Sequence, residues 1–321
     1  MVSIYVHRHG EATRVDRIDP ACLTADSTDV LWVDLADPTT EEGLLLADVF
    51  HFHPLSVEDA LGAIHHPKIE AYPSYLYLIV HGINFRETER WFATQDVSFF
   101  LGRNYLVTVH DGGSRSVARL KEICARAEHA LAEGPVGLLH RLIDSMVDNY
   151  RPEIEGIEMQ IDELEDEAIL GRRSDLVRDI LAVKRDLAFL RRVVIPQRDA
   201  VGRLARREFA VISDEMAFRF RDVYDQLVRL SDEAALFQDR VTGILEAHLS
   251  TISNRLNLVM KVLTVMSTIF LPLTVLTGVW GMNVQLPVFP GGDAAQFWWV
   301  AGCMVVISGG MLVVFRRKGW I

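Results

Sequence analysis

Residues 262–283 read VLTVMSTIFLPLTVLTGVWGMN, an apolar run that ends in Gly-Met-Asn. A second apolar run covers residues 297–315. The first run up to Trp280 and the second run are each about 19 residues long, enough to cross a hydrocarbon layer of roughly 30 Å at 1.5 Å per residue. The sequence therefore predicts a membrane hairpin: a first span with the Gly-Met-Asn turn at 262–283, an external loop at 284–296, and a second span at 297–315. Two helices cannot enclose a water-filled path, so transport through this hairpin requires several copies of the chain.

The charges around the hairpin predict its orientation. Arg316, Arg317 and Lys318 lie in the tail at 316–321, directly after the second span, whereas the loop at 284–296 has no Lys or Arg. By the positive-inside rule both termini are cytoplasmic in a multi-pass protein of the inner cell membrane. The first 29 residues contain no long apolar run behind a basic start, so no secretory signal is expected.

Composition excludes several classes of function. The 321 residues are 50% hydrophobic and carry a net charge of −11, so a basic nucleic-acid-binding surface is not expected. The three cysteines are scattered without a CxxC pair, so neither a disulfide framework nor a zinc finger is predicted. The chain has no phosphate-binding loop and no evident nucleophile–base pair. An enzyme, or a protein with a resident cofactor, is therefore not expected.

Residues 1–212 are predicted to form an α+β cytoplasmic domain with a helical arm. β-branched and aromatic runs separated by Gly, Pro, Asp or Asn predict short strands. The strands are expected at 3–7, 31–35, 75–81, 96–101 and 105–110, with a hairpin turn at Asn104. Helices are expected at 39–50, capped by Thr39 or Thr40, and at 54–61.

From residue 114 the periodicity is helical. Helices are predicted at 114–132, at 136–170 with at most an interruption at Arg151-Pro152, and at 174–194, stopped by Pro196. The last helix begins near Ser213 and meets no convincing breaker before Pro272. A helix over 213–280 would be about 100 Å long, with 213–261 as its cytoplasmic part. Its amphipathic stripe predicts packing against copies of itself.

One face of this helix could line a pore. Its residues recur at alternating steps of three and four, which places them along one seam. They are Asn257, Met260, Thr264, Ser267, Leu271, Thr274 and Gly278. In a symmetric ring the amides and hydroxyls would form oxygen-bearing rings, and Met260 and Leu271 would form hydrophobic rings where a narrow conduit closes by dewetting. Small and hydroxyl residues also mark tight helix packing in membranes, so both interpretations stay open here.

Asn283 lies at the outer end of this seam. A ring of neutral amides can bind a hydrated Mg²⁺ ion by outer-sphere hydrogen bonds without trapping it, because Mg²⁺ sheds water reluctantly. Gly281 is expected to allow a turn with positive φ after the helix, and Met282 to pack as an apolar support.

At these residues the chain resembles the CorA family of divalent-cation channels. The resemblance is carried by Gly281-Met282-Asn283, preceded by the segments at 257–265 and 269–274, and it extends upstream to segments at 53–60, 67–70 and 221–225. It implies a homopentameric funnel with an α/β/α cytoplasmic sandwich, long pore helices and a filter at Gly281-Met282-Asn283. It also implies that divalent ions bound between neighbouring cytoplasmic domains hold the pore shut.

The regulatory site departs from the family pattern. Asp222 matches the long-helix carboxylate of that site. Its acidic partner, expected in the turn after the strand at 75–81, is Arg86 here, with Glu87 adjacent. This departure leaves the geometry of the regulatory site open.

The external loop departs as well. It reads Val284-Gln285-Leu286-Pro287 where Mg²⁺-selective members often carry Met-Pro-Glu-Leu. ZntB-type zinc transporters share the fold. The transported and regulatory ion could therefore be Mg²⁺, Co²⁺, Ni²⁺ or Zn²⁺, and Mg²⁺ and Co²⁺ are favoured.

Three further signals have plain explanations beside functional ones. His51 and His53 would face different sides of a helix, so no metal site is predicted there. The acidic run at 153–167 could concentrate cations, or be a solvated helix face. A basic collar could gather near the inner membrane surface, and anchoring to anionic lipid explains it equally well. Its residues are Arg255, Lys261, Arg316, Arg317 and Lys318.

The sequence thus predicts a homopentameric channel for Mg²⁺ and Co²⁺, driven by the membrane potential. Its expected partners are further copies of the chain, membrane lipid and divalent cations. A proton-coupled Zn²⁺ carrier is the alternative, although neither span contains Asp, Glu, His, Arg or Lys past Lys261. A membrane-tethered helical scaffold is the alternative without transport.

Overall fold

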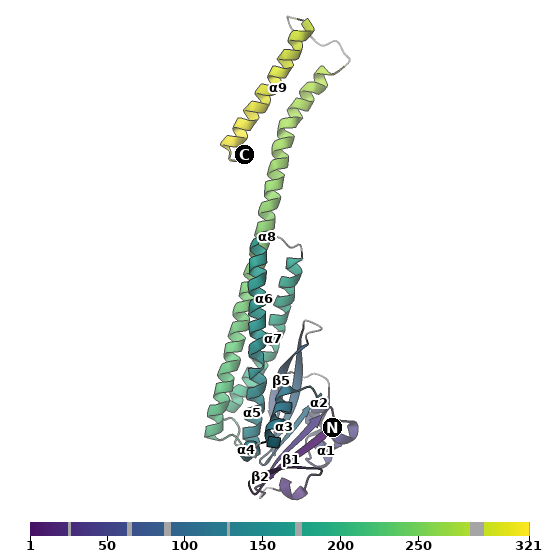
Figure 1. The fold of residues 1–321 in the computed structure, drawn as a ribbon, viewed down its shortest axis with the longest axis vertical. Helices are drawn as coiled ribbons and strands as arrows, with labels where there is room; N and C mark the ends of the chain where they lie inside the picture. The colour runs from purple at the N-terminus through teal and green to yellow at the C-terminus, as the bar shows by residue number, and fades with distance from the viewer. Residues whose placement is uncertain are drawn as a thin grey trace. The chain divides into compact units, whose positions relative to one another are not determined.

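The computed structural model describes residues 1–24, 27–62, 66–86, 91–126, 129–170, 175–282 and 292–320. The chain divides into two compact units, Met1–Leu245 and Glu246–Ile321. Figure 1 shows strands and helices in the first unit and two helical segments in the second.

A seven-stranded mixed sheet forms the base of the first unit. Its strand order is β2-β1-β3-β7-β6-β5-β4. The strands are β1 (Val2–Arg8), β2 (Glu11–Val15), β3 (Val30–Ala36), β4 (Lys68–Ala71), β5 (Leu76–Arg86), β6 (Trp91–Leu101) and β7 (Tyr105–His110). Only the β3–β7 pair is parallel, with Val33 opposite Val107, and the other pairs are antiparallel.

Both faces of the sheet are buried. Side chains alternate between the faces along a strand, so Leu78 and Phe99 enter one core while Tyr77 and Phe100 enter the other. Helices α1 (Thr40–Asp48) and α2 (Pro54–Leu61) cover the second core. The longer helices cover the first core (Figure 1). This layering confirms the predicted α/β/α sandwich.

The helical layer begins with α3 (Arg115–Arg126) and α4 (His129–Ala132). It continues with α5 (Gly134–Asp148), α6 (Tyr150–Leu170), α7 (Leu176–Ala205) and α8 (Asp214–Trp280). Helix α8 is unbroken over 67 residues, as predicted, which corresponds to about 100 Å. Its buried face in this unit includes Phe220, Val223 and Leu227. The predicted cap of α1 is confirmed: Thr39 and Glu42 form a reciprocal capping box.

The predicted end of the helix at Pro196 is wrong. Pro196 lies inside α7, which continues to Ala205. An internal proline costs a helix about 3 kcal/mol. Here Val193 and Val194 before it, and Gln197 and Ala200 after it, are buried. This packing on both sides outweighs the lost hydrogen bond.

The other differences are local. The helix predicted at 136–170 is interrupted at Asn149 rather than at Arg151-Pro152, because a proline fits the first turn of α6. Strands β2 and β4 were not predicted. β2 alternates only weakly and is mostly exposed, and β4 has just four residues. Strand β5 continues to Arg86, so this residue lies in a strand and not in a turn.

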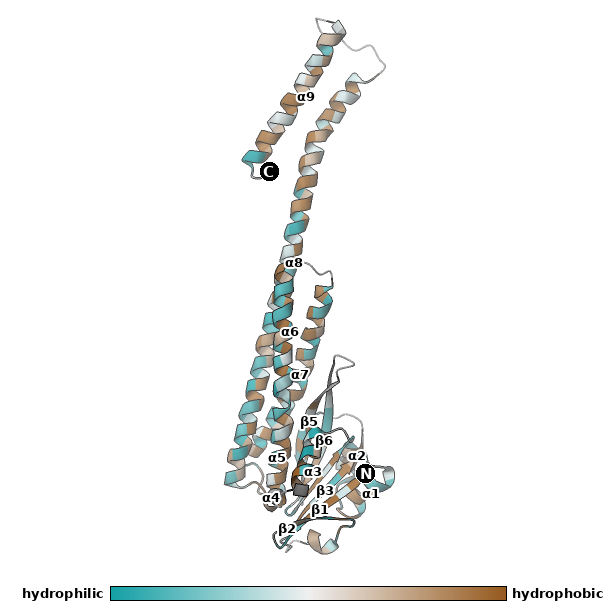
Figure 2. Ribbon diagram, in the orientation of Figure 1, coloured by the Kyte–Doolittle hydropathy of each residue, from teal (hydrophilic) through white to brown (hydrophobic). Residues whose placement is uncertain are grey.

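The second unit consists of the end of α8 and of α9 (Gly292–Arg317), which is longer than the predicted 297–315. Both helices are long and apolar enough to cross a membrane. In Figure 2 these segments are largely brown, the colour of hydrophobic residues. Gly319, at a φ of 66°, ends α9 in a Schellman motif: Trp320 N donates to Phe315 O and Gly319 N to Arg316 O.

A buried ionic network fastens α3 to the parallel strands. Asp34 is fully buried, and its carboxylate accepts a hydrogen bond of 2.5 Å from Thr108. Lys121 Nζ lies 2.5 Å from Asp34 Oδ2, and His110 Nε2 lies 3.2 Å from Oδ1. Burial acts to raise the pKa of Asp34, but His110 and Lys121 outweigh it, so the pKa lies below its usual value.

We predict that Lys121→Met destabilises the first unit by about 3 kcal/mol, because it leaves a buried carboxylate without its cation. The lowered pKa of Asp34 means that this contribution is present above about pH 4 and is lost in stronger acid. Urea unfolding of the full-length protein in detergent measures the loss. Arg151→Met is the control, because its ion pairs are exposed and should cost at most about 1 kcal/mol. Equal losses for the two variants would contradict the assignment.

Candidate ion pathway and carboxylate cluster

The predicted seam lies on one continuous helix and is uncovered. All seven residues from Asn257 to Gly278 fall within α8, and all are exposed in the single chain. Met260 is 59% exposed and Leu271 70%. The partly or fully buried positions between Asn257 and Gly278 lie on another face: Lys261, Val265, Ile269, Pro272, Leu273 and Leu276. A single chain therefore leaves the seam free for contact with further copies or with solvent.

The seam hydroxyls present oxygen acceptors to their surroundings. Thr264 Oγ1 donates to Met260 O at 2.7 Å, and Thr274 Oγ1 donates to Phe270 O at 2.9 Å. Each hydroxyl hydrogen is thus taken by the helix backbone, while the oxygen lone pairs stay available. Oxygen acceptors of this kind suit a cation or the water around it.

Gly281 does not have the predicted positive φ. Glycine is instead needed at position 281 because the backbone passes close to Thr277 O. Gly281 N donates to Thr277 O at 2.8 Å, and a Cβ on Gly281 would lie only 3.0 Å from that oxygen. The backbone thus turns tightly at the helix end. Met282 is 56% exposed and does not pack as a support in the single chain, whereas Asn283 lies outside the described residues.

The residues of the predicted basic collar come together in part. Lys261 Nζ donates to Gly319 O at 2.8 Å, which brings α8 beside the tail that carries Arg316, Arg317 and Lys318. Arg255 lies six residues before Lys261, about 9 Å along the helix. The predicted collar therefore has a structural link at Lys261, and its role stays a prediction.

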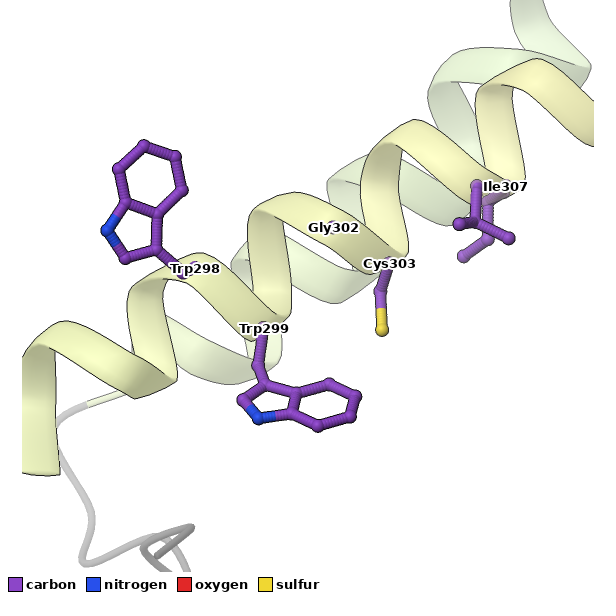
Figure 3. Close-up of a pocket in the computed structure, with 6 residues that line it drawn as sticks. Trp298, Trp299, Gly302, Cys303 and Ile307 are labelled. Carbon is purple, nitrogen blue, oxygen red and sulfur yellow. The ribbon is translucent and has the colours of Figure 1, made fainter. Parts of the chain in front are cut away.

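A hollow of about 550 Å³ follows one face of α9. It is lined by Trp298, Trp299, Gly302, Cys303, Val306 and Ile307 (Figure 3). The two indoles point to different sides of the helix, and Gly302 has no side chain to fill the hollow. The lining offers no carboxylate or amide, so this hollow suits hydrocarbon and not a cation.

Sequence reasoning missed a carboxylate cluster around Asp222. Asp222 is exposed on α8, and Asp144 and Asp148 lie one turn apart on α5. Burial raises the pKa of Asp144, and the charges of Asp148 and Asp222 raise it further, while His140 opposes the rise. The spacing of residues 140, 144 and 148 places all three on one helix face and was the available signal.

This cluster is incomplete as a metal site within one chain. Across the part of the chain that the structure describes, no three His, Cys, Asp or Glu side chains are placed to hold a metal ion. Glu87, the predicted partner of Asp222, lies outside the described residues, as does the side chain of Arg86. His51 and His53 serve local hydrogen bonds, to Ala47 O and from Leu55 N respectively.

The acidic run on α6 is mixed in role. Asp162 and Glu165 hold Arg240 of α8 at 2.8 and 2.6 Å, and Glu155 pairs with Arg151. Most other carboxylates of the run point to solvent.

The layered α/β/α unit and the long helix α8, whose apolar end and α9 are each long enough to cross a membrane, give the fold. The family that matches this chain comprises membrane transporters and not enzymes. The family described as CorA-like Mg2+ transporter protein matches residues 27–317, and the chain belongs to this family.

Relatives support this assignment along the whole chain. The cobalt/magnesium transport protein CorA of Thermotoga maritima is 30% identical over 337 residues, which cover 99% of this chain and 90% of that protein. The structure of the CorA magnesium transporter from Methanocaldococcus jannaschii matches with a TM-score of 0.85 at 24% identity, covering 100% of this chain and 99% of the other. The ZntB cytoplasmic domain from Vibrio parahaemolyticus matches with a TM-score of 0.65 at 15% identity, covering 78% of this chain and 98% of the other. The two structural matches show the fold alone.

We predict that Asp144→Asn stabilises the first unit when divalent ions are absent. At pH 7 the raised pKa of Asp144 means that its charge costs stability, and this cost disappears as the pH falls and the carboxyl takes up a proton. The thermal midpoint at pH 7 should rise by about 2 °C, and the difference from wild type should vanish near pH 4. Thermal unfolding in chelator measures it. Asp232→Asn, an exposed carboxylate on α8, is the control and should change nothing. A lower midpoint for Asp144→Asn would contradict the repulsion.

Proposed function

We propose that this protein is a homopentameric channel of the inner cell membrane that admits Mg²⁺ and Co²⁺. The observation that carries the proposal is the uncovered seam of α8, in which neutral oxygen acceptors alternate with exposed apolar side chains. Five such seams around one axis would bury the apolar groups against each other and turn the oxygens toward a shared path. The relatives named for cobalt and magnesium transport support the choice of ion.

In this proposal the pore has a filter and a gate. Gly281, Met282 and Asn283 form the filter, with the Asn283 amides facing the hydrated ion. Asn257, Thr264, Ser267 and Thr274 line the path with neutral oxygens, and Gly278 gives it width below the filter. Met260 and Leu271 form narrow apolar rings, which close the path by dewetting.

The membrane potential is sufficient to drive influx. With both termini in the cytoplasm, inward movement of a divalent ion gains roughly 4.6 kcal/mol per 100 mV. The basic collar of Arg255, Lys261, Arg316, Arg317 and Lys318 would anchor the inner end of the spans to anionic lipid.

Gating by intracellular divalent ions would act at Asp222. Its charge adds to those of Asp144 and Asp148, and this repulsion is relieved when a cation binds. Because the described residues of one chain do not complete a metal site, we assign the remaining ligands to a neighbouring copy, with Glu87 as one candidate. An ion held between copies would stabilise the closed assembly.

The proposed filter predicts that Asn283→Ala abolishes or sharply lowers Mg²⁺ uptake into liposomes while assembly stays intact. The loss follows from removing the amide oxygen that receives the hydrated ion. Gln285→Ala, in the external loop, is the control and should keep wild-type flux. Wild-type Mg²⁺ flux in Asn283→Ala would contradict the proposed role of Asn283 in the filter.

The same liposome assay separates the alternatives. Uptake of Mg²⁺, Co²⁺, Ni²⁺ and Zn²⁺ is measured with and without a pH gradient. Zn²⁺ flux that depends on protons would favour the zinc carrier, whereas liposomes that stay impermeable at every voltage would favour the scaffold.

The proposed gate predicts that Asp222→Ala reduces the protection of the cytoplasmic unit from proteolysis by millimolar Mg²⁺. Asp239→Ala, about 25 Å further along α8, is the control and should keep full protection. Unchanged protection in Asp222→Ala would place the regulatory ion elsewhere.

A further inference from the structure

Two neighbouring helices of the cytoplasmic unit carry opposite charges. Helix α6 has eight carboxylates and one arginine, whereas α7 has seven basic side chains and three carboxylates. The two helices pack against each other within the chain (Figure 1), and each leaves an outer face in solvent. Complementary charges on two exposed faces of one molecule suit contact between copies.

The exposed face of α7 has a seven-residue repeat. Arg178, Arg185 and Arg192 recur every seven residues, and Leu181, Ala188 and Ile195 recur between them at the same interval. Leu181 is 51% exposed, Ala188 is exposed and Ile195 is partly exposed. An apolar position in every seven residues is typical of a helix that packs along a second helix.

A shallow hollow of about 400 Å³ lies on this face. It is lined by Ala188, Arg191, Arg192, Ile195, Pro196 and Gln238. Arg191 Nη1 donates to Gln238 at 2.8 Å, but its buried Nε has no hydrogen-bond partner in the described ranges. Arg192 contacts His66 at 3.4 Å. In those same ranges neither guanidinium has a carboxylate within 4.0 Å, so the hollow fits an apolar side chain flanked by carboxylates.

Helix α6 carries such a group at the matching height. Met159 is 63% exposed, and its exposed neighbours include Glu155 and Glu158. Helices α6 and α7 form an antiparallel hairpin. Positions along the two helices can therefore be compared by counting residues back from the end of α6 and forward from the start of α7. Met159 stands 11 residues before Leu170, and Ala188 stands 12 residues after Leu176. The two therefore lie at nearly the same level, and Glu155 lies level with Arg191.

We propose that α7 of one copy docks along α6 of the next copy around the ring, with Met159 entering the hollow beside Ala188. This interface rests on the proposed homo-oligomer around α8. If the symmetry axis runs along α8, rotation about it changes no residue's position along that axis. Two residues at the same position along the axis in one chain are therefore also at the same position in neighbouring copies. A contact between two different faces of identical copies is heterologous, which is the type that closes a ring.

The charges select this pairing over the alternatives. Exposed ion pairs add little energy each, so burial of the apolar positions holds the contact. An α6–α6 contact would face carboxylates with carboxylates, and an α7–α7 contact would face arginines with arginines. Both are disfavoured by like charge, which leaves the acidic face of one copy against the basic face of the next.

Cysteine cross-linking of the full-length protein tests the interface. Two differently tagged chains, one with Met159→Cys and one with Ala188→Cys, are co-expressed in a Cys303→Ser background, since Cys22 and Cys124 are buried. We expect oxidation to give a disulfide-linked dimer carrying both tags, with part of each monomer band remaining, because only neighbours in one order around the ring bring the two cysteines together. Neither variant alone should cross-link, because the contact pairs two different faces.

The control pair is Met159→Cys with Arg178→Cys, on the same face of α7 but about 15 Å away along the helix, which should not cross-link. Size-exclusion chromatography of the same samples reports assembly. Full-size particles without the mixed dimer would overturn this interface and leave the proposed channel standing. A Met159→Cys homodimer would also overturn it, in favour of a symmetric contact. Monomeric particles would overturn both the interface and the pentamer.

Discussion

The uncovered seam of α8 is the constraint on which the rest of the molecule depends. The face from Asn257 to Gly278 is exposed in the part of the chain that the structure describes, although it carries side chains as apolar as Met260 and Leu271. In a bilayer the apolar side chains of this face could contact lipid, but its hydroxyl oxygens would find no hydrogen-bond donor or cation there. Association around a shared axis satisfies both kinds of group at once. In the proposed homo-oligomer, the long helix and the charged faces of the layered first unit would hold several copies in that arrangement.

The sequence predicted the elements that depend on periodicity or on local capping. The unbroken α8, the capping box of Thr39 and Glu42, and the limits of α2 follow from the chain itself. Prediction failed where distant packing decides. Pro196 is a strong local breaker, and only the burial of Val193, Val194 and Gln197 against other elements keeps α7 intact. Strand β4 has four residues and exists only because β5 offers it an edge.

Some features of the candidate site could be predicted from the sequence, and others depend on the fold. The seam could be derived from spacing alone, because every member lies on one helix. The grouping of Asp144 and Asp148 with Asp222 could not be derived in this way, because Asp222 lies 74 residues after Asp148 and only the fold brings α5 and α8 together. Gly281 shows a third case. The glycine predicted a turn with positive φ, but the structure shows a close contact with Thr277 O instead. Either reason requires glycine, so the sequence alone does not distinguish them.

In the proposed channel the same ion meets two chemically opposite environments. A pore must release the ion quickly, so neutral amide and hydroxyl oxygens, which hold it through its water shell, are better there than carboxylates. A regulatory site must instead register the ion at rest. Burial raises the pKa of Asp144, and the charges of Asp148 and Asp222 raise it further, so a bound dication would offset part of the cost of keeping this carboxylate charged. Because α8 carries both Asp222 and the pore seam, relief of that repulsion acts on the helix that lines the path. The neutral pore seam would bind the ion weakly and the Asp222 site would bind it more strongly, both on α8. The transported ion could therefore also control the opening of its own path.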